Sequence, residues 1–164
     1  MIRFVMVASL LVGCRLSLES DAVSQACEVN TMSATCLEAE TGQHADLAFI
    51  EQSIFAPGCA FPGCHDGGNS PQGKVDLRPG KSHDHLVDFT SGIDPTRKLV
   101  VPNDVKSSYL MLMLQDFPPD QATPPGVDPP ARAGFMPRGS STTLCCQKLA
   151  AIERWINAGA PSSN

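Results

Sequence analysis

Residues 59–65 read Cys59-Ala-Phe-Pro-Gly-Cys64-His65, so two cysteines are followed directly by a histidine. Covalent haem attachment requires this set of side chains, because two thiols bond the vinyl groups of the porphyrin and an adjacent imidazole ligates the iron. The usual signature places two residues between the cysteines, whereas this chain has four. The stretch is therefore a candidate haem site. Whether it binds haem depends on the helices and the second iron ligand that the rest of the chain provides.

The backbone around this stretch favours a bulged loop over a helix. Pro62-Gly63 prevents one smooth helical turn from Cys59 to His65, so the two extra residues are expected to bulge outward. Asp66-Gly67-Gly68 then lets the backbone pass close to a porphyrin without a side-chain clash. We expect His65 to be the proximal iron ligand, with its other ring nitrogen donating to a backbone carbonyl.

Two other kinds of site fit the same residues. A Cys59–Cys64 disulfide would close the turn and leave His65 at the surface. A zinc site would need four Cys or His ligands, and the adjacent pair Cys145-Cys146 supplies two further thiols. The residues alone leave both alternatives open beside haem.

The N-terminus has the pattern of an export signal. One positive charge at Arg3 precedes an apolar run over 4–12, which is too short to span a membrane. Its end, Leu11-Val12-Gly13-Cys14, resembles the lipobox of bacterial lipoproteins, which implies removal of 1–13 and lipidation of Cys14. Acyl chains would then hold the protein to the membrane of the cell envelope, facing the periplasm or in the outer membrane. The alternatives are an ordinary secretory peptide cleaved nearby and chance placement of a cysteine at position 14.

Residues 14–45 show little apolar periodicity and are predicted to form a flexible tether. In an oxidising compartment, Cys27 and Cys36 are expected to close a local disulfide across the eight residues between them. A metal or redox role for this pair is the alternative.

The remaining chain, 46–161, predicts one all-α domain with three main helices and long Pro/Gly-rich loops. Apolar residues recur at helical spacing over 46–55, where Asp46 serves as N-cap, over about 105–115, and over 141–157. The connecting segments 66–106 and 117–134 are rich in Gly, Pro and Asp and predict turns and surface loops.

A second iron ligand is expected from the loop after the proline-rich segment. Met136 lies in Gly134-Phe-Met136-Pro137 and would present its thioether from a stiffened loop, although a methionine that merely packs is the alternative. Arg97 and Lys98 are candidate partners for haem propionates, or simply surface charges. His83 and His85 are weaker candidates for the iron, since histidines in a polar run are usually solvated.

Cysteine count and charge limit the remaining possibilities. With Cys14 set aside, six of the seven cysteines remain, which fits two thioethers plus two disulfides as well as three disulfides. A disulfide between the adjacent Cys145 and Cys146 would be strained, so one of them is expected to pair with another loop cysteine. The net charge of −5 argues against nucleic acid as a partner.

Several short motifs occur in a characteristic order along the chain. They are Ile54 to Ala60, Cys64-His65-Asp-Gly67, Val75-Asp-Leu77, Leu99-Val-Val-Pro102, Ser108-Tyr-Leu110, Met136-Pro137 and Ile152 to Pro161. Together they resemble the planctomycete-type cytochrome c domain, which is also widespread in exported proteins and lipoproteins of myxobacteria. The resemblance covers roughly 46–161, and the four-residue gap departs from it.

The resemblance implies a small cytochrome c-like domain with one covalent haem c. Cys59 and Cys64 would form the thioethers, His65 would be the proximal ligand and Met136 the distal ligand. With both axial positions filled, the implied function is one-electron transfer to a redox partner protein rather than enzyme chemistry. A labile Met136 would open a peroxidase-like activity. The competing hypothesis is a haem-free, disulfide-stapled envelope lipoprotein that acts as a binding or structural module.

Overall fold

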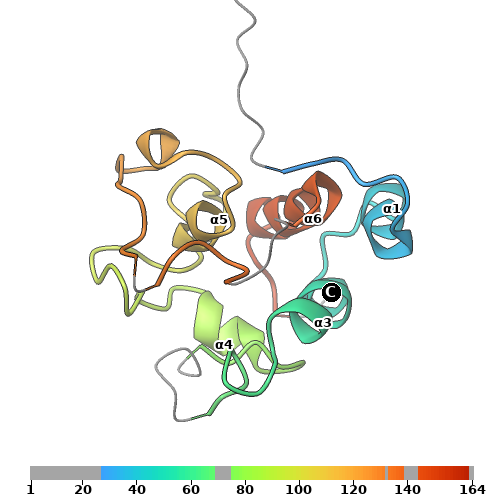
Figure 1. Cartoon of the computed structure of the whole chain (residues 1–164), viewed down its shortest axis with the longest axis horizontal. Coiled ribbons are helices and arrows are strands. Elements are labelled where there is room, and N and C mark those ends of the chain that lie inside the picture. The colour runs from blue at the N-terminus through green and yellow to red at the C-terminus, as the bar shows by residue number, and fades with distance from the viewer. Residues whose placement is uncertain (1–26, 69–74, 132, 139–143, 163–164) are drawn as a thin grey trace, which may run out of the picture.

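The computed structural model describes residues 27–68, 75–131, 133–138 and 144–162, and the regular elements of this part are helices joined by long loops (Figure 1). The elements are α1 (Ala34–Thr41), α2 (Leu47–Ile50), the π-helical turn η1 (Glu51–Phe55), α3 (Ala56–Gly58), α4 (Ser82–Leu86), α5 (Tyr109–Met113), the 3₁₀ turn η3 (Pro119–Gln121) and α6 (Cys146–Asn157). Extended pairing within the described ranges is limited to isolated β-bridges, such as Val87 with Val100. The predicted all-α class is confirmed.

The helix that leads to Cys59 is continuous from α2 through η1 to α3. It begins at the predicted cap, because an Asp46 carboxylate oxygen accepts from the Phe49 amide at 2.7 Å. Its apolar face, which includes Ile50, Ile54 and Phe55, is buried. The five-residue hydrogen-bond spacing of the π-helical turn occurs once more after η1, where the Ala60 amide donates to the Phe55 carbonyl at 2.9 Å. Such turns insert an extra residue and are frequent beside functional sites.

Helix α6 lies between α1 and α5 and provides much of the core (Figure 1). The apolar side chains on one face of α6 are at most 1% exposed, as their helical spacing predicts; they are Leu149, Ile152, Trp155 and Ile156. The buried indole of Trp155 donates to the Pro161 carbonyl at 2.9 Å. The helix begins at Cys146 and not at 141, and residues 139–143 lie outside the described part.

The middle helix is shorter than its apolar pattern predicts. It begins at Tyr109, not near 105, because the preceding polar residues form a turn of their own. The Asp104 carboxylate accepts from the Ser107 amide at 3.0 Å and from its hydroxyl at 2.7 Å. The Ser108 hydroxyl donates back to the Asp104 carbonyl at 2.7 Å. Local side-chain bonds of this kind compete with the helical ladder.

The predicted tether and its disulfide need correction. Residues 34–41 form α1, which packs against α6, so the folded domain extends N-terminal to 46. The predicted Cys27–Cys36 disulfide is wrong, because Cys27 bonds Cys146 and Cys36 bonds Cys145. Cys145 is the extended cap of α6 and Cys146 its first helical residue, so the two side chains diverge toward different partners. Cys14 and the predicted signal lie outside the described residues.

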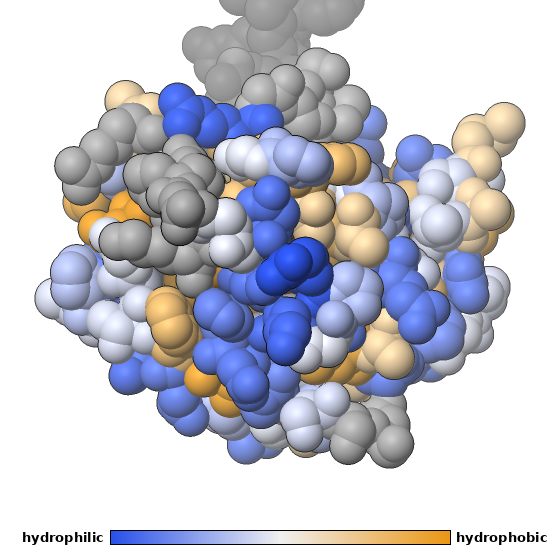
Figure 2. Space-filling model, turned by 90° about the horizontal axis from the view of Figure 1, so that it is seen from below, coloured by the Kyte–Doolittle hydropathy of each residue, from blue (hydrophilic) through white to orange (hydrophobic). Residues whose placement is uncertain are grey.

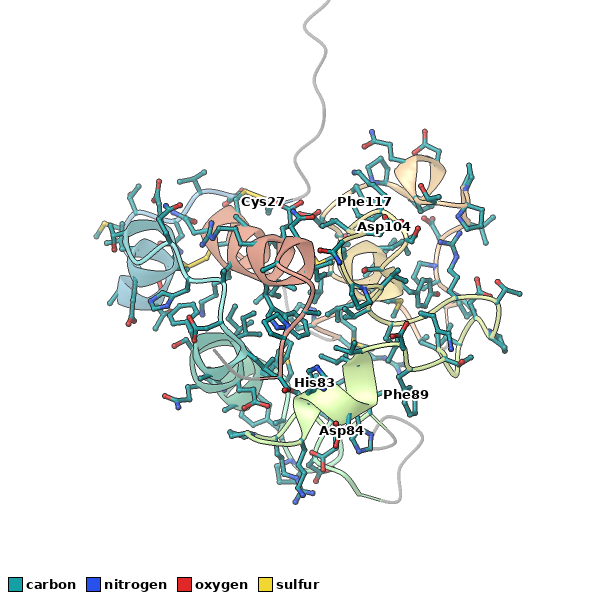
Figure 3. The ribbon with its side chains drawn as sticks, turned by 180° about the vertical axis from the view of Figure 1, so that it is seen from behind. Cys27, His83, Asp84, Phe89, Asp104 and Phe117 are labelled. Atoms are coloured by element: carbon teal, nitrogen blue, oxygen red, sulfur yellow. A yellow bond between two sulfur atoms is a disulfide. The ribbon has the colours of Figure 1, made fainter. Side chains whose placement is uncertain are left out.

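The two disulfides join segments that are 119 and 109 residues apart in sequence. Figure 3 shows Cys27 beside α6, where the N-terminal segment meets this helix. Disulfides persist in oxidising compartments, so the protein belongs in a non-cytoplasmic environment. In the part of the chain that the structure describes, every helix is too short or too polar to cross a membrane.

Candidate functional site around Cys59, Cys64 and His65

The two cysteines of the candidate site are thiols, unlike Cys27, Cys36, Cys145 and Cys146. Cys59 is half-buried at the end of α3, whereas Cys64 is exposed. Burial of the Cys59 thiol is the main cause that raises its pKa to about 11, and the electrostatic interaction with the nearby Cys64 adds to it. The thiol therefore stays protonated at neutral pH. The alternative disulfide between these two cysteines is not formed in this structure.

The loop from Cys59 to His65 is closed by its own backbone. The His65 amide donates to the Cys59 carbonyl at 3.2 Å, and the Cys64 amide donates to the Phe61 carbonyl at 2.9 Å. Gly63 has a φ of +83°, a conformation that glycine adopts without strain. Phe61 is 49% exposed, so the middle of the loop stands outward while its ends stay together. The four-residue gap therefore leaves Cys59 hydrogen-bonded to the residue that follows Cys64.

The ring of His65 is fixed by the segment that follows the loop. Its Nδ1 lies 3.2 Å from the Val75 carbonyl oxygen, and the Leu77 amide donates to the His65 carbonyl at 2.9 Å. Because a carbonyl only accepts, Nδ1 must carry the proton. A neutral imidazole then has its lone pair on Nε2, the nitrogen that can bind a metal. This is the arrangement expected from the sequence for an iron-ligating histidine.

Met136 comes from a separate loop that is tied to α5. Its amide donates to the Met113 carbonyl at 2.8 Å, and Gly134, with a φ of +65°, donates to the Pro130 carbonyl at 3.0 Å. The side chain of Met136 is half-buried against the core. The structure thus brings Cys59, Cys64 and His65 together in one loop. Iron ligation by His65 and by Met136 stays a prediction.

Arg97 is a buried cation and not a surface charge. Its side chain is 5% exposed, its Nε lies 3.2 Å from an Asp94 carboxylate oxygen, and its Nη2 donates to the Pro124 carbonyl. Among the described residues, its buried Nη1 has no hydrogen-bond partner. It lines a hollow of about 220 Å³ with Tyr109 and apolar residues of the proline-rich loop. Lys98, its predicted companion, is exposed, with its ammonium 3.1 Å from the Thr90 hydroxyl.

The weaker sequence candidates, His83 and His85, lie on α4. His83 donates from Nε2 to the Ala160 carbonyl at 3.1 Å, and its Nδ1 is 3.5 Å from Asp84, so it ties α4 to the end of the chain (Figure 3). The ring of His85 lies 5.8 Å from that of Phe89. These contacts give His83 a structural role.

The zinc alternative loses two of its ligands. Cys145 and Cys146 are both bonded to other cysteines. Among the described residues, no group of three or more His, Cys, Asp or Glu side chains is placed to hold a metal ion.

Sequence reasoning missed two buried carboxylates that hold the segment after the loop. Glu51 and Asp76 are 7% and 5% exposed, respectively. Glu51 accepts from the Gly80 amide at 2.8 Å and from the Ser82 hydroxyl at 2.6 Å. The sequence signal for Glu51 was an acidic residue among buried apolar positions of a helix. Hydrophilic residues gather at the centre of the face seen from below (Figure 2). Arg78, Lys81 and Asp84 are exposed.

Comparison with known proteins returns no match: no protein-family model, curated protein or solved structure corresponds to this chain. Function is therefore inferred from the chemistry of the site.

Proposed function

We propose that this chain is a c-type cytochrome that carries single electrons in the bacterial cell envelope. The supporting observation is the division of the described cysteines into two classes. Four form long-range disulfides, whereas Cys59 and Cys64, the two that belong to the motif ending in His65, remain thiols. Two free thiols next to an imidazole whose Nδ1 is already bonded form the donor set that covalent haem attachment needs.

The proposal assigns one haem c to this donor set of two thiols and an imidazole. Cys59 and Cys64 would hold the porphyrin through thioethers, His65 would ligate through Nε2, and Met136 would be the distal ligand. The unpartnered Nη1 of Arg97 would suit a propionate carboxylate, because buried guanidinium donors favour charged acceptors. When bound, the haem would supply a reversible one-electron couple at its iron.

The protein's own groups would restrict the site to electron transfer. The bond from Nδ1 to the Val75 carbonyl holds the His65 ring in one tautomer and increases its basicity as a ligand. A thioether from Met136 would be the second iron ligand and would keep substrates and water away from the iron. The proposal is thus an electron carrier and not an enzyme. Peroxidase-like activity would require Met136 to leave the iron.

The proposal places the domain at a membrane surface. The lipobox-like end of the export signal, Leu11 to Cys14, supports a lipid anchor at Cys14. The redox partner would be another envelope protein that approaches the domain from outside the cytoplasm.

The test is export of the full chain from a host with the cytochrome c maturation system, beside a control cytochrome. We expect red protein with a Soret band, and haem that stays on the chain in a denaturing gel. The C59S/C64S variant should lose the covalent haem. Colourless protein from cells that mature the control would contradict the proposal.

A haem-free, disulfide-stapled envelope lipoprotein is the second candidate. The observation in its favour is that two long-range disulfides and the buried cluster around Trp155 hold the N-terminal segment and α1 to α6. The same export experiment distinguishes the two candidates, because this one predicts colourless, folded protein.

A further inference from the structure

The segment from Val75 to Ser82 contacts His65 at two points. The Val75 carbonyl accepts from the His65 ring at 3.2 Å, and the Leu77 amide donates to the His65 carbonyl at 2.9 Å. One residue therefore has both its ring and its backbone held by the same short segment. Any displacement of this segment moves the acceptor of the His65 ring.

Asp76 lies between these two contacts and is held by Arg78. Its carboxylate accepts from the Arg78 amide at 3.1 Å, from Nε at 2.9 Å and from Nη2 at 2.6 Å. Asp76 is 5% exposed, so its charge needs this partner. The hydrogen bonds from Arg78 lower the pKa of Asp76 to about 2. The pair is therefore charged throughout the neutral range.

The Asp76–Arg78 ion pair packs against the backbone of Gly67, two residues after His65. A Cβ atom at Gly67 would lie 2.6 Å from both the Arg78 Nη2 and an Asp76 carboxylate oxygen. Gly67 also has a φ of +72°, which disfavours other residues. Glycine at this position lets the pair lie directly against the chain that leaves His65.

The far end of the segment is tied to the helix that carries Cys59. Glu51 of η1 is 7% exposed and accepts from the Gly80 amide at 2.8 Å and the Ser82 hydroxyl at 2.6 Å. This brings the start of α4 beside the helix that ends in α3 (Figure 1). Residues 75–82 thus connect the helix before Cys59 to His65 by a route that does not pass through the loop 59–65.

We propose that residues 75–82 are a positioning strap, in which the Asp76–Arg78 ion pair and Glu51 hold the Val75 carbonyl against the His65 ring. The inference rests on the proposed function. By accepting the Nδ1 proton, the carbonyl makes the imidazole a stronger donor, which would stabilise the oxidised iron of a bound haem and lower its midpoint potential. Asp76 and Glu51 act through Val75 and are positioning residues.

The test compares D76N with D88N in the exported full chain. Asp88 is exposed and lies outside the strap, so D88N removes the same charge as D76N without changing a strap residue. Its φ of +53° is a conformation that asparagine tolerates. In D76N we expect a higher midpoint potential than in wild type. We also expect the His65 Nδ1 proton to exchange with solvent about tenfold faster, as measured by NMR, because weakening one hydrogen bond changes a rate by about this factor. D88N should leave both unchanged.

A D76N protein with wild-type potential and wild-type proton exchange would overturn the inference. If D76N does not accumulate, R78Q takes its place, because Arg78 is half exposed and glutamine keeps an N–H donor beside the buried Asp76 carboxylate while it removes the positive charge. If wild-type protein is colourless, the proposed function fails, but the strap is still tested by exchange of the Leu77 amide. That amide should exchange faster in R78Q than in D88N, and equal rates would overturn the strap as well.

Discussion

Cys36 and Cys145 are buried and bonded to each other where α1 meets α6, whereas Cys59 and Cys64 remain thiols in a loop closed by hydrogen bonds. The first region is joined covalently across more than a hundred residues of sequence. The second is held by hydrogen bonds between its own backbone groups. The same residue type thus has a structural role in one region and is available for cofactor chemistry in the other.

The largest effect is expected from removing the free thiols. In C59S/C64S, covalent haem should be lost completely, because no thioether can form, while the disulfide region stays intact. Haem staining of a denaturing gel measures the loss, and peptide mapping of the two disulfides is the control. Haem that still remains on the denatured C59S/C64S chain would remove these residues from the site.

Removing one long-range disulfide should affect stability instead. C36S/C145S should lower the free energy of unfolding by about 2–5 kcal/mol, because the unfolded chain regains the freedom that the crosslink removed. Urea unfolding followed by Trp155 fluorescence gives the value. The folded variant should still attach haem. A variant that is as stable as wild type would mean that this disulfide contributes little to the fold.

Truncation of the carboxylate that ties the strap to its helix should have an intermediate effect. E51A leaves the Gly80 amide and the Ser82 hydroxyl without their acceptor, which should cost about 1–3 kcal/mol. E51Q keeps an acceptor at this place and should recover part of the loss. Equal stability of E51A and wild type in the same urea experiment would show that the strap is not held at this end.

The smallest effect is expected in acid. Arg78 lowers the folded-state pKa of Asp76 to about 2, so this pair stabilises the fold above the ordinary carboxyl pKa near 4, and the contribution is lost as pH falls from about 4 to 2. The loss should be at most about 2 kcal/mol, because Arg78 is half exposed and water screens the pair. Relative to wild type, D76N should show a shallower decline of stability across this range. Parallel curves would contradict the assignment.

Sequence predicted the features that are set locally. The Asp46 cap and the buried face of α6 depend on residues one or two turns apart, and both occur in the structure. The Cys27–Cys36 pairing failed because it assumed that neighbours in sequence bond, whereas the approach of α1 to α6 selects the partners.

The candidate site shows the same division. The bulged loop and the backbone acceptor for the His65 ring were predicted from Pro62-Gly63 and from the needs of an iron ligand. The strap was missed because Glu51 and Gly80 are 29 residues apart, and no local pattern brings them together.

Intact mass after alkylation without reduction tests the central claim most directly. The mature full chain from a host that attaches haem should carry the mass of one haem, with no alkylated cysteine among the six after Cys14. Reduction should then free four thiols and leave the haem in place. A chain without haem mass, with Cys59 and Cys64 alkylated or joined in a third disulfide, would contradict the account.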